Sequence, residues 1–337
     1  MRSAHTALDL IHAIKNMQTA NSHMDVFFPY AAKKRFEFQV AQRSFIYYTT
    51  AATALKALQS REIWMRLTRV MNDHSEVQHG LNGLSTALSP NTSACQQLAS
   101  SLNGCVQGLY QEVRNQFEQW VPSIFSDTFI TCISEHYKED RVYGKLSMWR
   151  AYGGNAGVAF VLRPNAFFSE TQALAAYTVP ILYANPEVIH AMLLEIAQNI
   201  LNNTAYVQHI GRDGTRNAVF HALRFIAICT KHPAFKEEQE WRIISSPSLQ
   251  QSNYVKQYQE VIGEIPQPVL KIELKDRPDE GLIGLQLEDF IEEILIGPCE
   301  YPDIVARSIC QELLQGGFTS LATRIRSTGI PLRLSQR

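Results

Sequence analysis

The sequence predicts an α+β fold, because strand-like and helix-like segments mix along the chain without a regular alternation of the two. No internal repeat and no low-complexity linker divides the chain, which argues against a repeat architecture. With 337 residues, 45% of them hydrophobic and 19% charged, the chain is long enough to bury a sizeable core in one large domain or two smaller ones.

The main fold is expected to begin with a strand at residues 44–50 (SFIYYTT), whose aromatic and β-branched residues favour extended structure. Thr49 or Thr50 can cap a helix at residues 51–60, since a threonine oxygen accepts hydrogen bonds from the first backbone amides of a helix. Residues 62–67 alternate polar and apolar and predict a second strand. Later strands are expected at residues 129–134, 156–162, 177–183, 268–274 and 290–298.

Three helical stretches accompany these strands. Apolar residues recur at helical spacing near the amino terminus, over residues 94–121, and over residues 187–229 apart from a glycine-rich turn expected at 209–216. We therefore expect a helical amino-terminal extension at residues 1–43 and a single α+β domain at residues 44–337, with helical insertions at about 94–121 and 187–229. The extension and the 94–121 helix offer surfaces for a protein partner.

The most densely charged stretch reads KEEQEWRII over residues 236–244, just after Pro233. Proline disfavours helix for the residue before it, so the preceding apolar helix should end there. If residues 238–244 are extended, the two-residue period places Glu238, Glu240 and Arg242 on one face of a strand. Such a row is costly to bury unless it is paired or used, so it is either a structural ion row or a functional site.

Composition restricts the function classes. The net charge of −1 gives no electrostatic argument for nonspecific nucleic-acid binding. No apolar run approaches the ~20 residues that span a bilayer, and the first residues lack the features of a secretory signal, so we expect a cytoplasmic protein, with export by a route that leaves no cleavable signal as the alternative. The six cysteines show no zinc-binding spacing and are expected to be reduced and structural.

A second polar group of residues comprises Asn72, Asp73 and Glu76. Asp73 followed three residues later by Glu76 fits a capping box at a helix start. With His74 and His79 nearby, a metal-dependent nuclease or hydrolase that uses Asp73 and Glu76 is an alternative. That alternative predicts that Asp73, Glu76 and Glu240 converge on a cation.

Six blocks, in this order, resemble the bacterial domain of unknown function 2971 family. Its pattern has an early Tyr-His-Tyr-Thr-Ser-like strand, a Met-Trp-x-x-Tyr-Gly block, a Glu-x-Glu-x-Arg strand and a closing strand that ends in Ile-Gly-Pro. Here the blocks are Tyr47–Thr50, Asn72–Glu76, Cys132–Ser134, Met148–Gly153, Glu238–Arg242 and Ile291–Pro298, within roughly residues 44 to 330. One departure is Tyr47, which stands where the family pattern has histidine.

That family in turn looks similar to the ADP-ribosyltransferase superfamily. The resemblance implies a mixed, mostly antiparallel split sheet flanked by helices, NAD as the substrate, and no metal. It implies catalytic roles for Glu240 at the ribose, Glu238 on the acceptor side and Tyr47, because a fixed carboxylate stabilises the oxocarbenium-like charge that forms when nicotinamide leaves. The implied nucleotide-binding residues are Tyr48, Thr49, Asn72, Ser134, Trp149, Tyr152 and Arg242.

The activity implied by this resemblance is that of an NAD-consuming transferase or NAD glycohydrolase in a toxin or phage-defence role. Its acceptor would be a protein or a nucleic acid. A third alternative is a noncatalytic nucleotide-binding regulatory module, which binds its ligand without turnover. For Trp149 and Tyr152, packing in the core and at its rim is the alternative to a platform for the nicotinamide ring.

Overall fold

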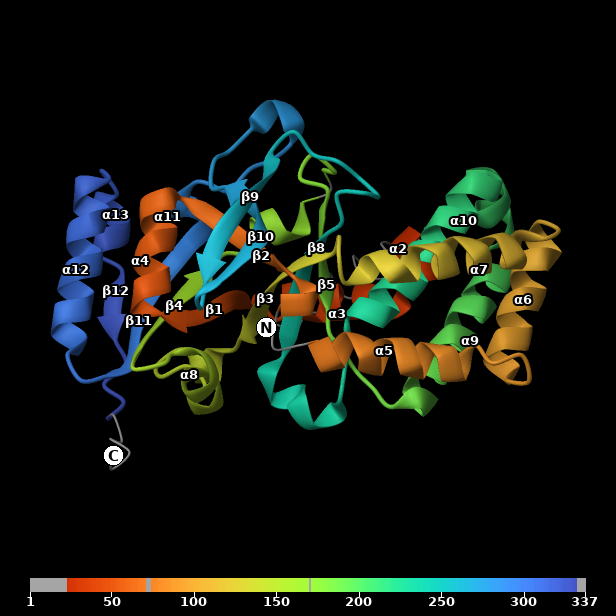
Figure 1. Ribbon diagram of the computed structural model, residues 1–337, viewed down its shortest axis with the longest axis horizontal. Coiled ribbons are helices and arrows are strands. Elements are labelled where there is room, and N and C mark those ends of the chain that lie inside the picture. Colours follow the sequence, from red (N-terminus) through yellow and green to blue (C-terminus); the bar gives the residue numbers. More distant parts are fainter. Residues whose placement is uncertain (1–22, 71–73, 170, 332–337) are drawn as a thin grey trace, which may run out of the picture. The chain divides into compact units, whose positions relative to one another are not determined.

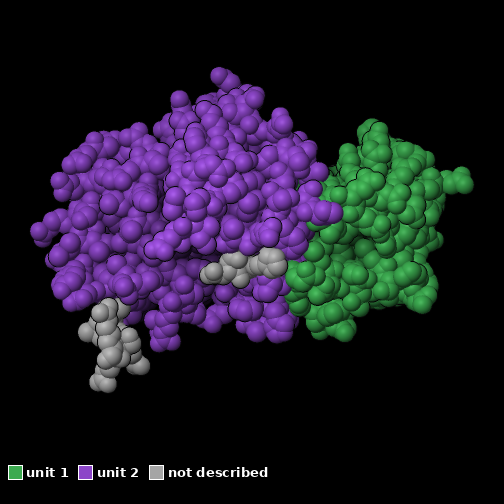
Figure 2. Space-filling model, viewed as in Figure 1, with its two compact units in different colours: residues 1–37, 78–121, 184–230 green, residues 38–77, 122–183, 231–337 purple. Residues whose placement is uncertain are grey.

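The computed structural model describes residues 23–70, 74–169 and 171–331 (Figure 1). Two compact units make up the chain (Figure 2). Residues 1–37, 78–121 and 184–230 form the first, which we call the helical unit, and residues 38–77, 122–183 and 231–337 form the second, the sheet unit. Of the amino-terminal extension expected at residues 1–43, residues 1–22 lie outside the described part.

The helical unit takes its helices from all three of its chain segments. They are α2 (His23–Phe27), the first part of α3 (Pro29–Val40), most of α5 (His74–Ala87), α6 (Ser93–Cys105), α7 (Leu109–Trp120), α9 (Pro186–Asn202) and α10 (Thr204–Ile228). The stretch 94–121 was expected to be one helix, but it is two, with Gly108 in the left-handed region (φ 78°) just before α7. The turn expected at 209–216 is instead part of α10, which departs from helical geometry at Gly211 (φ 71°).

The sheet unit is built on a ten-stranded sheet. Neighbouring strands along its main path are β12 (Ile325–Ser327), β11 (Ile291–Cys299), β4 (Ala156–Leu162), β1 (Ser44–Thr50), β3 (Phe129–His136), β2 (Glu62–Leu67), β10 (Ile265–Glu273) and β9 (Val255–Ile262). Two strands lie off this path: β8 (Glu240–Ser245) pairs with β3 and also with β5 (Ala176–Pro180). Among the described strands of this sheet, only β11 and β12 pair in parallel. The predicted α+β class with a mostly antiparallel sheet and flanking helices is confirmed.

The sheet divides at β3. One edge of β3 pairs with β8 over residues 129–134. The other edge pairs with β2 at residues 129–130 and with β1 at residues 134–136. Within the described chain, no strand pairs with that edge between these two contacts, so β1 and β2 diverge beside Thr131 and Ile133.

One face of the sheet, which we call the α4 face, carries the larger core. Helix α4 (Ala51–Ser60) connects β1 to β2, and Thr50 Oγ1 caps it by accepting a hydrogen bond from the Thr53 amide at 3.3 Å. Buried Ala54 and Leu58 of α4 pack in the same core as Trp241 of β8. The predicted cap and both predicted strands of this β1–α4–β2 segment are confirmed.

The opposite face, the α8 face, carries a smaller core. Helix α8 (Leu146–Tyr152) brings Met148 and Trp149 against Ile46 and Tyr48 of β1. The remaining elements of the sheet unit are α11 (Leu287–Phe290), α12 (Pro302–Gln315), α13 (Thr319–Ala322), β6 (Leu182–Tyr183), the end of β7 (Thr230–Lys231), and the short 3-10 helices η1 (Thr68–Val70), η2 (Val121–Ile124), η3 (Lys138–Asp140), η4 (Asn165–Phe168), η5 (Pro233–Glu238) and η6 (Pro278–Glu280). Among the described residues, no helix has the length and apolar character needed to cross a bilayer.

Candidate functional site

The residues singled out from the sequence fall on both faces of the sheet. Trp241 packs in the core of the α4 face, so its neighbours Glu240 and Arg242 point to the α8 face, since successive side chains of a strand alternate. By the same alternation Tyr48 points to the α8 face and Tyr47 to the α4 face. Two candidate sites result, an ion cluster on the α8 side of the sheet and a cavity on the α4 side.

The ion cluster consists of Glu76, Lys231, Glu238, Glu240 and Arg242. Lys231 Nζ lies 2.6 Å from Glu238 Oε2 and 3.0 Å from Glu240 Oε2. It also lies 2.8 Å from Glu76 Oε1. Arg242 Nε donates to Glu240 Oε1 at 2.9 Å, and its Nη2 donates to Glu76 Oε2.

Three carboxylates share two cations in this cluster, and the shortage of positive charge falls on Glu238. Burial would raise the pKa of Glu240, but the charges of Arg242 and Lys231 outweigh it and lower that pKa to about 2. Burial raises the pKa of Glu238, and Lys231 only partly offsets this. For Lys231, burial would lower the pKa, but Glu240, Glu238 and Glu76 raise it well above its ordinary value.

Glu238 enters the cluster from a helix and not from a strand. The extended segment expected at residues 238–244 begins only at Glu240, because η5 ends at Glu238 and Gln239 adopts a left-handed conformation (φ 47°). The prediction that strand alternation aligns Glu238 with Glu240 was therefore wrong. The two carboxylates meet through Lys231, which contacts both.

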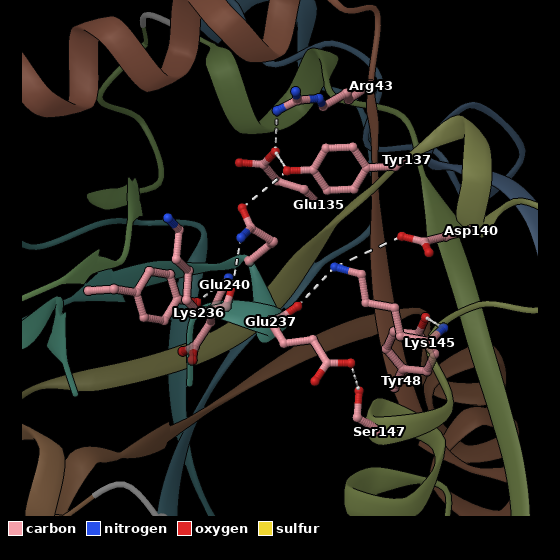
Figure 3. A network of polar contacts seen from close by, with 12 residues as sticks. Arg43, Tyr48, Glu135, Tyr137, Asp140, Lys145, Ser147, Lys236, Glu237 and Glu240 are labelled. Carbon is pink, nitrogen blue, oxygen red and sulfur yellow. Dashed lines mark hydrogen bonds and ion pairs between the residues drawn. The ribbon is translucent and has the colours of Figure 1, made fainter. Parts of the chain in front are cut away.

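The segment that supplies Glu238 is anchored to the α8 region (Figure 3). Ser147 Oγ donates to Glu237 Oε1 at 2.8 Å, and Lys145 Nζ donates to the Glu237 carbonyl at 3.0 Å. The backbone amide of Lys145 in turn donates to Tyr48 Oη at 2.8 Å. These contacts connect η5, the start of α8 and β1, and so fix the backbone beside Glu238.

A second buried carboxylate, Glu135, lies at the end of β3. It accepts hydrogen bonds from Tyr137 Oη at 2.9 Å and from Trp241 Nε1 at 3.0 Å, and it forms an ion pair with Arg43 (Figure 3). Because Trp241 is a central residue of the larger core, this bond satisfies an indole donor that would otherwise be buried without a partner. Glu135 therefore stabilises the core beside β8.

Trp149 is buried, and its ring contacts several elements. Its ring meets Tyr48 edge to face, with centroids 4.8 Å apart, and its Nε1 donates to the Tyr143 carbonyl at 2.7 Å. A Cβ placed on Gly297 would stand 2.5 Å from the ring, so the β11 backbone also lies against it. Trp149 is thus a core residue, while Tyr152, at the other end of the block, is 39% exposed.

A cavity of about 470 Å³ opens on the α4 side, where β1 and β2 diverge. Side chains from both faces of β2 line the cavity, for example Ile63 from one face and Arg66 from the other. The cavity therefore extends around the edge of β2 that no described strand covers. Thr131 and Ile133 line it from β3, at the residues that neither β1 nor β2 pairs with. The cavity therefore occupies the gap in the sheet.

The cavity is mostly apolar, with a few polar groups. Its aromatic and aliphatic lining includes Phe160, Phe167, Phe290, Leu58, Ile243 and Ile291. Tyr47 and Thr49 supply hydroxyl groups, and burial raises the pKa of Tyr47, so its phenol is a neutral donor at ordinary pH. Arg66 and Lys56 supply positive charge.

The remaining predicted site residues lie outside both candidate sites or outside the described part of the chain, except Glu76, which belongs to the ion cluster. Ser134 is buried opposite Glu240 in the β3–β8 ladder. Asn72 and Asp73 lie outside the described residues. Glu76 and Glu240 do converge on positive charge, as the nuclease alternative requires, but that charge belongs to Lys231 and Arg242. Within the described residues, no group of three or more His, Cys, Asp or Glu side chains could hold a metal ion.

The sequence analysis did not identify Lys231 or Arg66. Lys231 stands directly before His232-Pro233 at the end of an apolar helix, which is an ordinary position for a solvated lysine. Arg66 is one charge in an alternating strand, and alternation alone indicated a solvated side chain. Only the gap between β1 and β2 gives Arg66 its place in the cavity.

Residues 148–243 match the family model described as a protein of unknown function, DUF2971. The matched region runs from α8 to β8 and contains Trp149, Glu238, Glu240 and Arg242. The match supports the family to which the sequence blocks pointed. No curated protein and no solved structure matches the chain.

Proposed function

We propose that the cavity of the sheet unit binds a nucleotide of the NAD class. The observation that carries this proposal is the coincidence of the cavity with the gap between β1 and β2, where Tyr47 and Thr49 lie. A cavity of about 470 Å³ falls within the ~300–1,000 Å³ typical of small-molecule sites, which are mainly apolar with few polar groups.

The lining suits a flat ring joined to a polar group. Phe160, Phe167 and Phe290 offer aromatic surface for a base or a nicotinamide. Tyr47 and Thr49 can donate to and accept from ribose hydroxyls or an amide. Binding without turnover is the primary proposal, because Glu240 points to the face opposite the cavity.

Calorimetric titration of the full chain with NAD, AMP and nicotinamide mononucleotide tests this proposal. Ala57 of α4 lines the cavity, so Ala57→Phe should weaken binding by about tenfold or more, through loss of space for the ligand. Ala52→Phe, on an exposed position of the same helix, is the matched control. Failure of the parent to bind any of the three nucleotides at millimolar concentration, or equal affinity of both variants, would refute the site.

The ion cluster favours a second candidate function, glycosyl transfer from NAD. Glu238 and Glu240 both contact Lys231, yet their surroundings shift the pKa of Glu240 down and that of Glu238 up. Carboxylate pairs with separated pKa values are the usual basis of acid and base roles in one site. On this proposal Glu240 stays ionised and stabilises an oxocarbenium-like charge, Glu238 exchanges the proton, and the chain acts as an NAD-consuming transferase or glycohydrolase in a toxin or defence role.

Release of nicotinamide from NAD, followed by chromatography, tests this second function. Glu240→Gln and Glu238→Gln should each abolish release, whereas Glu139→Gln, at an exposed position of η3 outside the cluster, should leave it intact. Thermal unfolding of each variant separates loss of activity from loss of fold. If both cluster variants still release nicotinamide, or if the parent releases none, turnover at this cluster is ruled out. A nuclease activity that a chelator abolishes would instead favour the metal-dependent alternative.

A further inference from the structure

Arg66 lines the cavity and carries a positive charge. No carboxylate among the described residues forms an ion pair with it. Its Nε donates to Gln267 Oε1 at 3.0 Å and its Nη2 donates to the Val70 carbonyl at 2.9 Å. Both acceptors are neutral. These bonds use two of the five N–H donors of a guanidinium, so further donors remain for a ligand.

Several other cations of the sheet unit are neutralised locally, whereas Arg163, like Arg66, donates to neutral acceptors. Lys231 and Arg242 meet carboxylates in the ion cluster, and Arg43 meets Glu135. Burial lowers the pKa of Arg66, although Tyr47 opposes this shift. A half-buried guanidinium with no counter-charge among the described residues is costly, and a bound anion would remove part of that cost.

The rest of the lining carries one more cation and one carboxylate. Lys56, exposed on α4, is a second cation at the cavity. The carboxylate of Glu62 also lines it, and Lys271 Nζ lies 3.3 Å from that carboxylate but 2.7 Å from Glu260 Oε1, so Lys271 offsets the charge of Glu62 only in part.

We propose that Arg66 binds a phosphate of the cavity's ligand, so that the cavity takes a phosphorylated nucleoside in preference to a free nucleoside. This inference rests on the nucleotide binding proposed above. Guanidinium and phosphate match in geometry, because two N–H donors of one guanidinium can meet two oxygens of one phosphate. Arg66 is then the residue that sets the ligand class, while the apolar lining holds the ring.

Two matched pairs of probes test the proposal by calorimetry, AMP with adenosine and nicotinamide mononucleotide with nicotinamide riboside. The parent should bind the phosphorylated member of at least one pair about 10- to 100-fold more tightly, as expected for hydrogen bonds to a charged group. Arg66→Gln should remove this preference and leave nucleoside affinity unchanged, and Arg66→Lys should keep part of it. Arg163→Gln is the control, since Arg163 donates to the carbonyls of Glu288 and Asp289 and is not one of the residues that line the cavity.

Failure of the phosphate proposal gives a different result from failure of nucleotide binding itself. Equal affinity for both members of each pair, or a preference that survives in a folded Arg66→Gln variant, overturns the role of Arg66 while nucleotide binding stands. Failure of all four probes to bind the parent overturns both proposals. If Arg66→Gln does not fold, the salt dependence of a Lys56→Gln variant decides, because with Lys56 removed a phosphate held by Arg66 should still lose affinity steeply as salt rises.

Discussion

Tyr47 and Glu240 point to opposite faces of one sheet. Tyr47 lines the cavity between β1 and β2, while Glu240 contacts Lys231 and Arg242 in the ion cluster. The two proposals therefore rest on side chains of different faces, ligand binding on Tyr47 and acid–base chemistry on Glu240, and they can be tested independently.

Substitution of neighbouring tyrosines tests which face binds the ligand. Tyr47→Phe removes a hydroxyl from the cavity and should weaken nucleotide binding about 3- to 10-fold, with little change in stability. Tyr48→Phe should lower stability and leave nucleotide binding unchanged, because the Lys145 amide loses its acceptor while the lining of the cavity is unaltered. Calorimetric titration and chemical denaturation of both variants measure the two effects, and weaker binding in Tyr48→Phe alone would assign the site to the α8 face.

The β1–α4–β2 segment could be predicted because its signals are local. Alternation specifies each strand, and Thr50 caps the helix through an amide only three residues away. The matching block at β11 is likewise a strand. By contrast, 94–121 has one continuous apolar face and still forms two helices, because Gly108 takes a conformation that periodicity does not report.

The candidate sites were predictable only in part, because both depend on contacts between distant segments. Glu240 and Arg242 share a face by strand alternation, and the sequence indicated this. Lys231 joins them only because β7 ends beside β8, and Glu76 only because the start of α5 lies within reach. The cavity depends on the divergence of β1 and β2 along β3, which no single segment encodes.

The contact between Gly297 and Trp149 predicts a steric effect on stability. A Cβ at position 297 would lie 2.5 Å from the Trp149 ring, too close for any real contact. Gly297→Ala should therefore destabilise the chain by about 1–3 kcal/mol, as overpacking usually does. Gly104→Ala, in helix α6 with no atom within 4 Å of the added Cβ, should be neutral or slightly stabilising. Equal denaturation midpoints for Gly297→Ala and the parent would contradict this packing.

Removal of the central cation should be more damaging than removal of a surface one. Lys231→Met removes the cation that contacts Glu76, Glu238 and Glu240, so it should lower the free energy of unfolding by about 3–5 kcal/mol. Lys256→Met, at an exposed position of β9, should change it by less than about 0.5 kcal/mol. Denaturant titration at neutral pH measures both, and similar values for the two variants would show that the cluster is not a buried network.

The low pKa of Glu240 predicts acid sensitivity of the fold. Its pKa is about 2 in the folded chain and about 4.3 when unfolded, so the unfolded chain binds this proton first as pH falls. The stabilisation is complete above about pH 5 and is lost as pH falls through about 2, and it amounts to roughly 3 kcal/mol. Glu238, with its raised pKa, acts in the opposite sense, since its ionisation at higher pH opposes folding.

Unfolding free energies measured between pH 5 and pH 2 therefore separate the two glutamates. Glu240→Gln should be less stable than the parent at pH 6 and should show a shallower fall in stability toward pH 2, because the group that titrates is gone. Glu238→Gln should fall in stability at least as steeply as the parent, because a group whose titration opposes that fall is gone, and it should lose less stability at pH 6. An unchanged acid slope in Glu240→Gln would mean that Glu240 is not the carboxylate held ionised by Arg242 and Lys231.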